Sequence, residues 1–304
     1  MKRCHELARF GTHLGDTFES QAGAAETAAS AVARQATRQV AVVTFEPLPQ
    51  AFFRPAQAPA RLTTVYQKLN LLNELNVDTT WLMRVDGALA AMSARDFAGD
   101  VLQRGLAASQ VVVGEDFRFG QGREGDVALL RELGCQMDFS VTIVPAVTCQ
   151  DDRVSSTAIR AALARSDFAA ARQLLGRDFR MEGHVVVGQR LGRKLGYPTA
   201  NIRVRARPYP LQGIFAVYCR VAGGDWLPAV SSLGVRPTVG GEEPLLEVHF
   251  FDFAADLYGQ RLEVHFVAKL RDETHFGTIE ELVVQMQRDE AEARHILTTT
   301  QQPG

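Results

Sequence analysis

"LGRKLGYPTANIRV" (Leu191–Val204) marks the point where the character of the chain changes. It places two glycines ahead of a Pro-Thr-Ala-Asn turn, and a strand-like run follows. From about Gly183 onward, strand candidates such as "GIFAVYCRVAG", "LLEVHFFDF" and "RLEVHFVAKL" are closely spaced and separated by glycine-bearing turns. This pattern predicts a small antiparallel barrel or sandwich. An amphipathic stretch over Thr278–Leu297, starting at a threonine cap, predicts a closing helix.

The preceding part of the chain has a different rhythm, in which β-branched runs alternate with segments of helical spacing. The predicted strands are Val40–Phe45, Thr79–Val85, Gln110–Gly114 and Asp138–Val147. Alternating strands and helices predict a parallel sheet covered by helices. We therefore expect an atypical segment over residues 1–38, an α/β domain over 39–178 and a barrel domain over 179–304.

Composition limits the classes of protein to consider. The 304 residues are 46% hydrophobic and 22% charged, with a net charge of −2, so nothing indicates a nucleic-acid-binding protein. The four cysteines are scattered, which disfavours a disulfide framework or zinc site and favours a reducing cytoplasm. No long apolar run or secretory signal indicates a membrane span or export. The sequence contains no indication of oligomeric state.

The opening stretch has the chemistry of a phosphate site. Bare glycine backbone lets main-chain N–H groups approach an anion, so we expect Gly188 and Gly192 near phosphate, with Arg193 or Lys194 adding charge. Thr199 and Asn201, two residues apart on an extended chain, project to one side and offer the hard oxygen ligands that suit Mg²⁺. A glycine-rich hairpin with a capped turn is the alternative interpretation of the same residues.

A glutamate on a later predicted strand is a candidate catalytic residue for that phosphate site. On the strand "LLEVHFFDF", Glu247 and His249 face one way while Val248 and Phe250 face the other. Glu247 is therefore the candidate general base toward an attacking hydroxyl, and an exposed edge-strand glutamate is the alternative. We interpret His249 and His265 as structural or solvated, because no metal-ligand partners accompany them.

The α/β half contains two further candidate stretches. "GEDFRFGQGREGD" follows a predicted buried strand, where open α/β sheets bind ligands. We expect Phe117 and Phe119 to stack on a flat ring, with Arg118 and Arg123 near phosphate. Such aromatic side chains are otherwise core residues. "VSSTAIR" offers a helix start for an anion, with Ser155, Ser156, Thr157 and Arg160 as candidate anion-binding residues. A plain N-cap explains one serine but not the arginine.

Several of these stretches together resemble one family. "TFEPLPQAFF", "ARLTTVYQKL", "VGEDFRFGQGREGD", "VSSTAIR", "GRKLGYPTANI", "GVRPTV" and "LEVHFFDF", in this order, resemble the bacterial bifunctional riboflavin kinase/FAD synthetase. The resemblance implies a nucleotidyltransferase-like, Rossmann-like parallel sheet followed by a six-stranded antiparallel barrel and a C-terminal helix. It implies that riboflavin, FMN and ATP are substrates, that Thr199 and Asn201 bind Mg²⁺ with the ATP phosphates, and that Glu247 is the catalytic base. For the first half it implies that the motif Ser155–Arg160 contacts the ATP phosphates and that the flavin is bound by Asp116, Phe117, Phe119 and Arg123.

The N-terminus departs from the pattern of that family. The family opens with a strand leading into Gly-x-Phe-Asp-Gly-x-His-x-Gly-His, whereas "RFGTHLGD" keeps His13 as its candidate ATP-binding residue but has Asp16 where the second histidine belongs. An aspartate there would repel a triphosphate, so we expect FAD formation to be weak or absent. The preceding residues are poor strand formers, and we expect the first central strand to be missing. The alternatives are a kinase-only enzyme and a non-catalytic flavin or nucleotide sensor.

Overall fold

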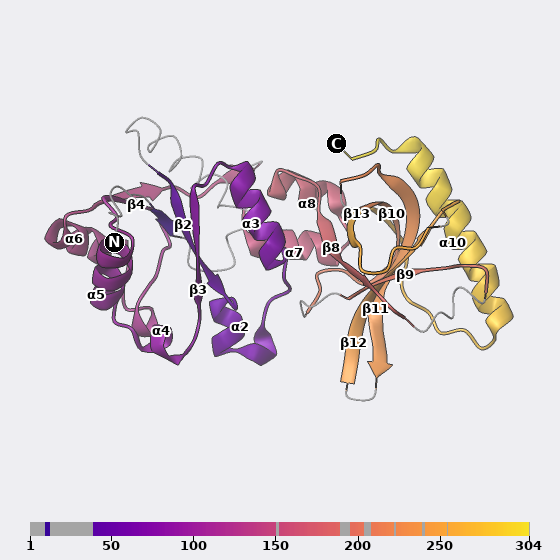
Figure 1. The fold of residues 1–304 in the computed structure, drawn as a ribbon, viewed down its shortest axis with the longest axis horizontal. Coiled ribbons are helices and arrows are strands. Elements are labelled where there is room, and N and C mark those ends of the chain that lie inside the picture. Colours follow the sequence, from indigo (N-terminus) through magenta and orange to yellow (C-terminus); the bar gives the residue numbers. More distant parts are fainter. Residues whose placement is uncertain are drawn as a thin grey trace. The chain divides into compact units, whose positions relative to one another are not determined.

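The computed structural model describes residues 10–12, 39–149, 152–188, 195–203, 208–221, 223–238, 241–253 and 255–303. The chain divides into two compact units, Met1–Ala158 and Ile159–Gly304 (Figure 1). The domain boundary predicted at residues 178/179 falls later in the chain than this division and remains a prediction.

The first unit contains a parallel sheet of five strands, in the order β3-β2-β1-β4-β5. The strands are β1 (Phe10–Thr12), β2 (Ala41–Glu46), β3 (Thr79–Arg84), β4 (Gln110–Gly114) and β5 (Ser140–Val144). Val111, Val112 and Val113 are at most 2% exposed, because helices and loops cover both faces of a parallel sheet. The parallel sheet expected from the alternating pattern and the Rossmann-like fold implied by the resemblance are both confirmed.

The central strand, which we expected to be missing, is present. Phe10 pairs with Ala41 of β2 on one side and with Val111 of β4 on the other. The prediction was wrong because it judged the residues before Arg9 by their side chains. A strand between two existing neighbours is held by main-chain hydrogen bonds, and Phe10–Thr12 can supply these over a short length.

Helical segments surround this sheet. They are α2 (Pro49–Phe53), η2 (Pro55–Gln57), α3 (Val65–Glu74), α4 (Gly87–Ala91), α5 (Ala94–Asp96), the π-helix η3 (Phe97–Gly105), η4 (Gln121–Arg123) and α6 (Val127–Met137). A short hairpin of β6 (Thr148–Cys149) and β7 (Asp152–Arg153) leads toward α7 (Ser156–Ala164). Ser93 is the N-cap of α5, since its hydroxyl accepts a hydrogen bond from the Asp96 N–H at 3.0 Å.

The second unit is a closed barrel in which strands follow one another in the order β10-β11-β12-β9-β8-β13, all pairs antiparallel. The strands are β8 (Arg180–Val186), β9 (Ala200–Arg203), β10 (Gly213–Val221), β11 (Leu227–Thr238), β12 (Gly241–Phe250) and β13 (Arg261–Arg271). Phe215, Leu233, Leu246 and Val264 are fully buried. Burying such a side chain contributes roughly 1.5–3 kcal/mol, so the interior stabilises the closed barrel. The predicted six-stranded barrel is confirmed.

Two helices pack on the barrel. The ring of Phe168 in α8 (Phe168–Leu175) contacts Phe215 and Phe266, with both pairs of ring centroids 6.1 Å apart. The closing helix α10 (Ile279–Thr299) begins at Thr278, whose hydroxyl caps the Glu281 N–H, as predicted. The Tyr218 hydroxyl of β10 donates to the Leu297 carbonyl at 2.6 Å, which fixes the end of α10 against the barrel wall.

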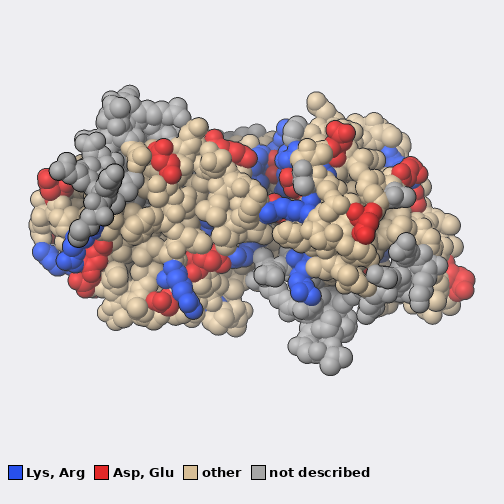
Figure 2. Space-filling model, in the orientation of Figure 1, with Lys and Arg blue, Asp and Glu red and all other residues tan. Residues whose placement is uncertain are grey.

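On the face shown in Figure 2, acidic and basic side chains of the described residues are interspersed. Within the described ranges, no helix combines the length and the apolar character needed to cross a bilayer. The cysteines in these ranges, Cys135, Cys149 and Cys219, are free thiols.

Candidate active sites

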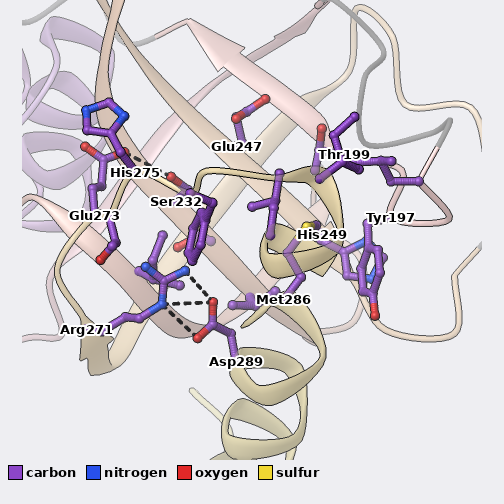
Figure 3. A pocket seen from close by; sticks show the side chains of 18 of the residues that line it. Tyr197, Thr199, Ser232, Glu247, His249, Arg271, Glu273, His275, Met286 and Asp289 are labelled. Carbon is purple, nitrogen blue, oxygen red and sulfur yellow. Dashed lines mark hydrogen bonds and ion pairs between the residues drawn. The ribbon is translucent and has the colours of Figure 1, made fainter. Parts of the chain in front are cut away.

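The barrel carries a cavity of about 520 Å³ on its outer surface, beside the beginning of α10 (Figure 3). Strands β11 and β12, the segment before β9, the segment after β13 and the first turns of α10 supply its lining. Because side chains alternate along a strand, β12 presents Glu247 and His249 to the cavity while Leu246 and Val248 are fully buried inside the barrel. The orientation predicted for Glu247 is confirmed.

Strand pairing brings the three predicted kinase residues together. Asn201 of β9 is the direct cross-strand partner of Glu247 of β12, so both side chains lie on one face of the sheet. Thr199 lies two residues before Asn201 and lines the same cavity as Glu247. A hydroxyl and a carboxylate thus line one cavity, and the Asn201 amide stands beside the carboxylate on the neighbouring strand. Direct neighbours in an antiparallel pair have Cβ atoms roughly 4.5–5.5 Å apart, a distance that one phosphate or metal ion can bridge.

Gly188 determines how the Asn201 amide lies. A Cβ atom at Gly188 would stand 2.6 Å from the Asn201 amide nitrogen and oxygen, so only glycine leaves space for this side chain. The Asn201 amide nitrogen donates to the Thr199 carbonyl at 3.3 Å. Its Oδ1 is buried and has no hydrogen-bond partner among the described residues. A buried oxygen without a partner costs stability unless a ligand completes it, and a hard cation such as Mg²⁺ fits this donor.

An ion pair between Arg271 and Asp289, which the sequence did not predict, lines this cavity. Arg271 at the end of β13 donates to both carboxylate oxygens of Asp289 in α10 at 2.7–3.1 Å (Figure 3). Asp289 is 4% exposed and also accepts from Gln285 at 2.9 Å. The pair fixes α10 to the barrel next to the cavity. A sequence signal was available, since Asp289 interrupts the apolar stripe of the closing helix.

The two histidines interpreted as structural make different contacts. His249 lies 2.9 Å from the Pro198 carbonyl through Nδ1, beside the cavity. His265 lies elsewhere on the barrel, 3.9 Å from Asp178. Burial lowers the pKa of His265 to about 4, against the opposing effect of the Asp178 carboxylate. The predicted phosphate-binding residues Gly192 and Arg193 lie outside the described residues.

The first unit has its own cavity, of about 650 Å³, at the carboxyl edge of the parallel sheet. Its lining comes from the end of β2, from α2 and from the loops that follow β3 and β4. Three arginines, Arg54, Arg118 and Arg123, and several apolar side chains line it. Open α/β sheets bind ligands at this edge, and a cavity with apolar walls and cations suits a flat ring that carries a phosphate.

The aromatic residues predicted to stack on a ligand lie in the core. Phe117 and Phe119 are each 2% exposed, and their rings stack on one another with centroids 5.3 Å apart. They are therefore core residues, in agreement with the alternative interpretation, although Phe119 also lines the cavity. Asp116 is bonded to Arg153 at 2.6 Å, which joins the loop after β4 to the segment before α7. Arg123 lines the cavity.

The serine-rich segment forms the start of α7. The Ser155 hydroxyl accepts a hydrogen bond from the Ala158 N–H at 3.1 Å and acts as an N-cap. Ser156 is 1% exposed, and its hydroxyl has no partner among the described residues. Thr157 and Arg160 follow in the same helix. His13 and Asp16 lie outside the described residues.

Comparison with known proteins gives matches to both units. The FAD synthetase family model matches residues 26–158, which excludes the stretch Arg9–Asp16, and the riboflavin kinase family model matches residues 175–297. A "Bifunctional riboflavin kinase/FMN adenylyltransferase" of Escherichia coli (strain K12) is 42% identical over 88% of this chain and 85% of that protein. A relative with the same name from Pseudomonas fluorescens is 43% identical over 83% of this chain and 81% of its own.

A solved structure described as a macrolide-efflux protein from Streptococcus pneumoniae has the same fold, with a TM-score of 0.77 and 27% identity over 94% of both chains. The sequence relatives cover nearly the whole of this chain and most of their own length at more than 40% identity. The chain therefore belongs to the family of bifunctional riboflavin kinases/FMN adenylyltransferases.

Proposed function

We propose that this chain phosphorylates riboflavin to FMN with ATP in its barrel unit and adenylylates FMN to FAD in its α/β unit. The observation that carries the kinase assignment is the pairing of Asn201 with Glu247, whose side chain lines the same cavity as Thr199. Membership of the bifunctional family supports both activities. The kinase-only and sensor alternatives are not favoured, because the family models match both units.

In the kinase reaction, Glu247 is the general base. Its carboxylate accepts the proton of the terminal ribityl hydroxyl, whose oxygen forms a bond to the γ-phosphorus while the bond from that phosphorus to the bridging oxygen breaks and ADP leaves. Mg²⁺, when bound, neutralises charge on the phosphates. Thr199 and the Asn201 Oδ1 would hold it, since Gly188 and the Thr199 carbonyl orient that amide.

For the adenylyltransferase reaction, the 650 Å³ cavity is the proposed flavin site. Its arginines would attract the FMN phosphate and its apolar wall would cover the ring system. The start of α7 is the proposed site for the ATP phosphates, supported by free helical N–H groups and by the buried hydroxyl of Ser156. The loop after β4 would be held in place by the ion pair of Asp116 and by the packing of Phe117 and Phe119.

The expectation that FAD formation is weak or absent is not favoured by the comparisons, because the FAD synthetase family model matches residues 26–158 and the relatives are named for both activities. The cytoplasmic location stays a prediction. One time course tests both activities: purified protein is given riboflavin, ATP and Mg²⁺, and the flavins are separated by chromatography. FMN should appear first and FAD should follow.

A chelator added at the start should stop FMN formation, and excess Mg²⁺ should restore it. A parallel reaction that starts from FMN measures the second step alone. Absence of FMN with Mg²⁺ and ATP present would overturn the kinase assignment. Absence of FAD from supplied FMN, with FMN formation intact, would restore the kinase-only alternative.

A further inference from the structure

The turn that carries Thr199 is attached to strand β12 by the side chain of His249. The Nδ1 atom of His249 lies 2.9 Å from the Pro198 carbonyl oxygen. His249 stands two residues after Glu247, on the same outer face of β12, and both line the 520 Å³ cavity. One side chain therefore connects the strand of the general base to the turn of the phosphate-binding residues.

Main-chain pairing cannot make this connection. The ladder between β9 and β12 ends at the pair of Ala200 and Val248, so the next pair would place Thr199 opposite His249. The chain before Thr199 is Tyr197–Pro198, and proline has no N–H to donate to a neighbouring strand. The His249 side chain donates a hydrogen bond to the Pro198 carbonyl at the point where the main-chain pairing stops. This bond joins the turn to β12 one residue beyond the last pair.

The imidazole ring is itself held on two sides. The Tyr197 ring lies 5.1 Å from it between centroids, at an interplanar angle of 59°. The Phe251 ring packs edge-on at 6.2 Å from the other direction along β12. These contacts restrict the rotamer of His249, so its hydrogen bond fixes the position of the turn rather than following its motion.

We propose that His249 is a positioning residue for phosphoryl transfer, which holds Thr199 in place relative to Glu247 through the Pro198 carbonyl. The inference rests on the proposed kinase function of this cavity. Because a carbonyl only accepts, Nδ1 carries the hydrogen in this bond, both in the neutral tautomer and in the imidazolium. The proposed role is therefore independent of the protonation of Nε2 and includes no proton transfer.

Three substitutions separate this role from packing and from acid–base chemistry. In His249→Asn the amide nitrogen takes the place of Nδ1 and keeps the donor, whereas in His249→Gln the longer side chain places its amide near Nε2. His249→Phe keeps a ring without a donor. We expect kcat/KM for MgATP to fall 10–100-fold in the Gln and Phe variants, since small misplacements of substrate-binding groups have large kinetic effects. The Asn variant should stay within about threefold of the wild type.

The pH dependence of the kinetics is a readout that goes beyond structural integrity. The ratio of the Asn variant to the wild type should not change between pH 6 and 8.5, whereas loss of a proton-transfer group would remove one limb of the profile. His184 of β8 is exposed and does not line the cavity, so His184→Asn and His184→Gln are matched controls expected to behave as wild type. Thermal unfolding of every variant checks that the barrel is intact.

The inference is overturned if His249→Asn is as defective as His249→Phe, if His249→Gln and His249→Phe keep wild-type kinetics, or if the Asn variant loses one limb of the pH profile. Calorimetric binding of MgADP to the same variants separates failure of the inference from failure of the proposed function. If the wild type forms no FMN, the proposed function fails. The affinities for MgADP then test the positioning of the turn separately from catalysis. The Asn variant should bind MgADP nearly as tightly as the wild type, and the Gln and Phe variants should bind it more weakly.

Discussion

In the barrel, the candidate site residues stand on paired strands, whereas in the parallel sheet they stand in loops beyond the strand ends. Asn201 and Glu247 are cross-strand partners, so the hydrogen-bond register places them together. Arg118 and Arg123 follow β4, and Arg54 follows α2, so loop conformation places them. A site held by register tolerates little displacement, while a site held by loops can adjust to its ligand.

The largest effect should come from the strand-borne carboxylate. Replacing Glu247 by Gln removes the proton acceptor but keeps the size of the side chain, so FMN formation should slow by roughly 10²–10⁴-fold. Conversion of supplied FMN to FAD by the same variant should be unchanged, because that chemistry belongs to the other unit. Separate kinetic assays from riboflavin and from FMN measure both.

Retained kinase activity in Glu247→Gln would remove Glu247 from its role. Loss of MgADP binding in calorimetry would show a disrupted site rather than a missing base. General-base catalysis by Glu247 predicts that the variant binds MgADP normally but forms FMN slowly.

The next effect tests the precision of the register-held site. In Gly188→Ala, the new methyl group would overlap the Asn201 amide, which must then move away from the cavity. Since a displacement of about 1 Å can lower a rate by about 10², we expect a loss of this size in kcat/KM for MgATP.

The matched control is Gly87→Ala, where a Cβ atom meets nothing within 4 Å. Its kinase activity should equal that of the wild type. Equal activities of the Gly188→Ala and Gly87→Ala variants would show that the Asn201 amide need not occupy its present position.

A smaller effect is expected in the loop-held site. Arg123→Met removes one of three guanidinium groups at the 650 Å³ cavity, so the KM for FMN should rise about tenfold, which corresponds to one hydrogen bond to a charged group. Arg131→Met, at an exposed arginine of α6 that does not line the cavity, is the control. An unchanged KM for FMN in Arg123→Met would exclude this arginine from the flavin site.

The smallest effect concerns stability of the barrel unit. Because burial lowers the folded-state pKa of His265 to about 4, the unfolded chain binds more protons between pH 6.5 and 4. The stabilisation that comes from keeping this imidazole neutral is present above pH 6.5 and is lost as pH falls toward 4. The slope is at most about 1.4 kcal/mol per pH unit.

Urea unfolding in a Trp81→Phe background, followed through the fluorescence of Trp226, measures this dependence. Trp226 reports on the barrel because its ring lies 6.2 Å from His265 and is stacked by Arg180 and Arg220. The variant His265→Gln should show a flatter dependence between pH 6.5 and 4.5. An identical slope in both proteins would contradict the pKa shift.

Much of the fold was predictable from local patterns. The run Gln110–Gly114 and the alternation around Glu247 correspond to β4 and to the outer face of β12. The central strand Phe10–Thr12 was not predictable, because its place between β2 and β4 depends on main-chain pairing rather than on its own residues. Phe117 and Phe119 were chosen as ligand contacts, but their sequence does not reveal which face of a loop is buried.

The sequence by itself determined the two periodicities, the cap at Thr278, the side of β12 on which Glu247 stands and the family. Only the tertiary structure decided that Asn201 faces Glu247, that Gly188 makes room for Asn201 and that Arg271 reaches Asp289. The physical reason is that periodicity and capping depend on neighbours along the chain. Register, close approach and buried ion pairs depend on residues far apart in sequence, which meet only when the barrel closes.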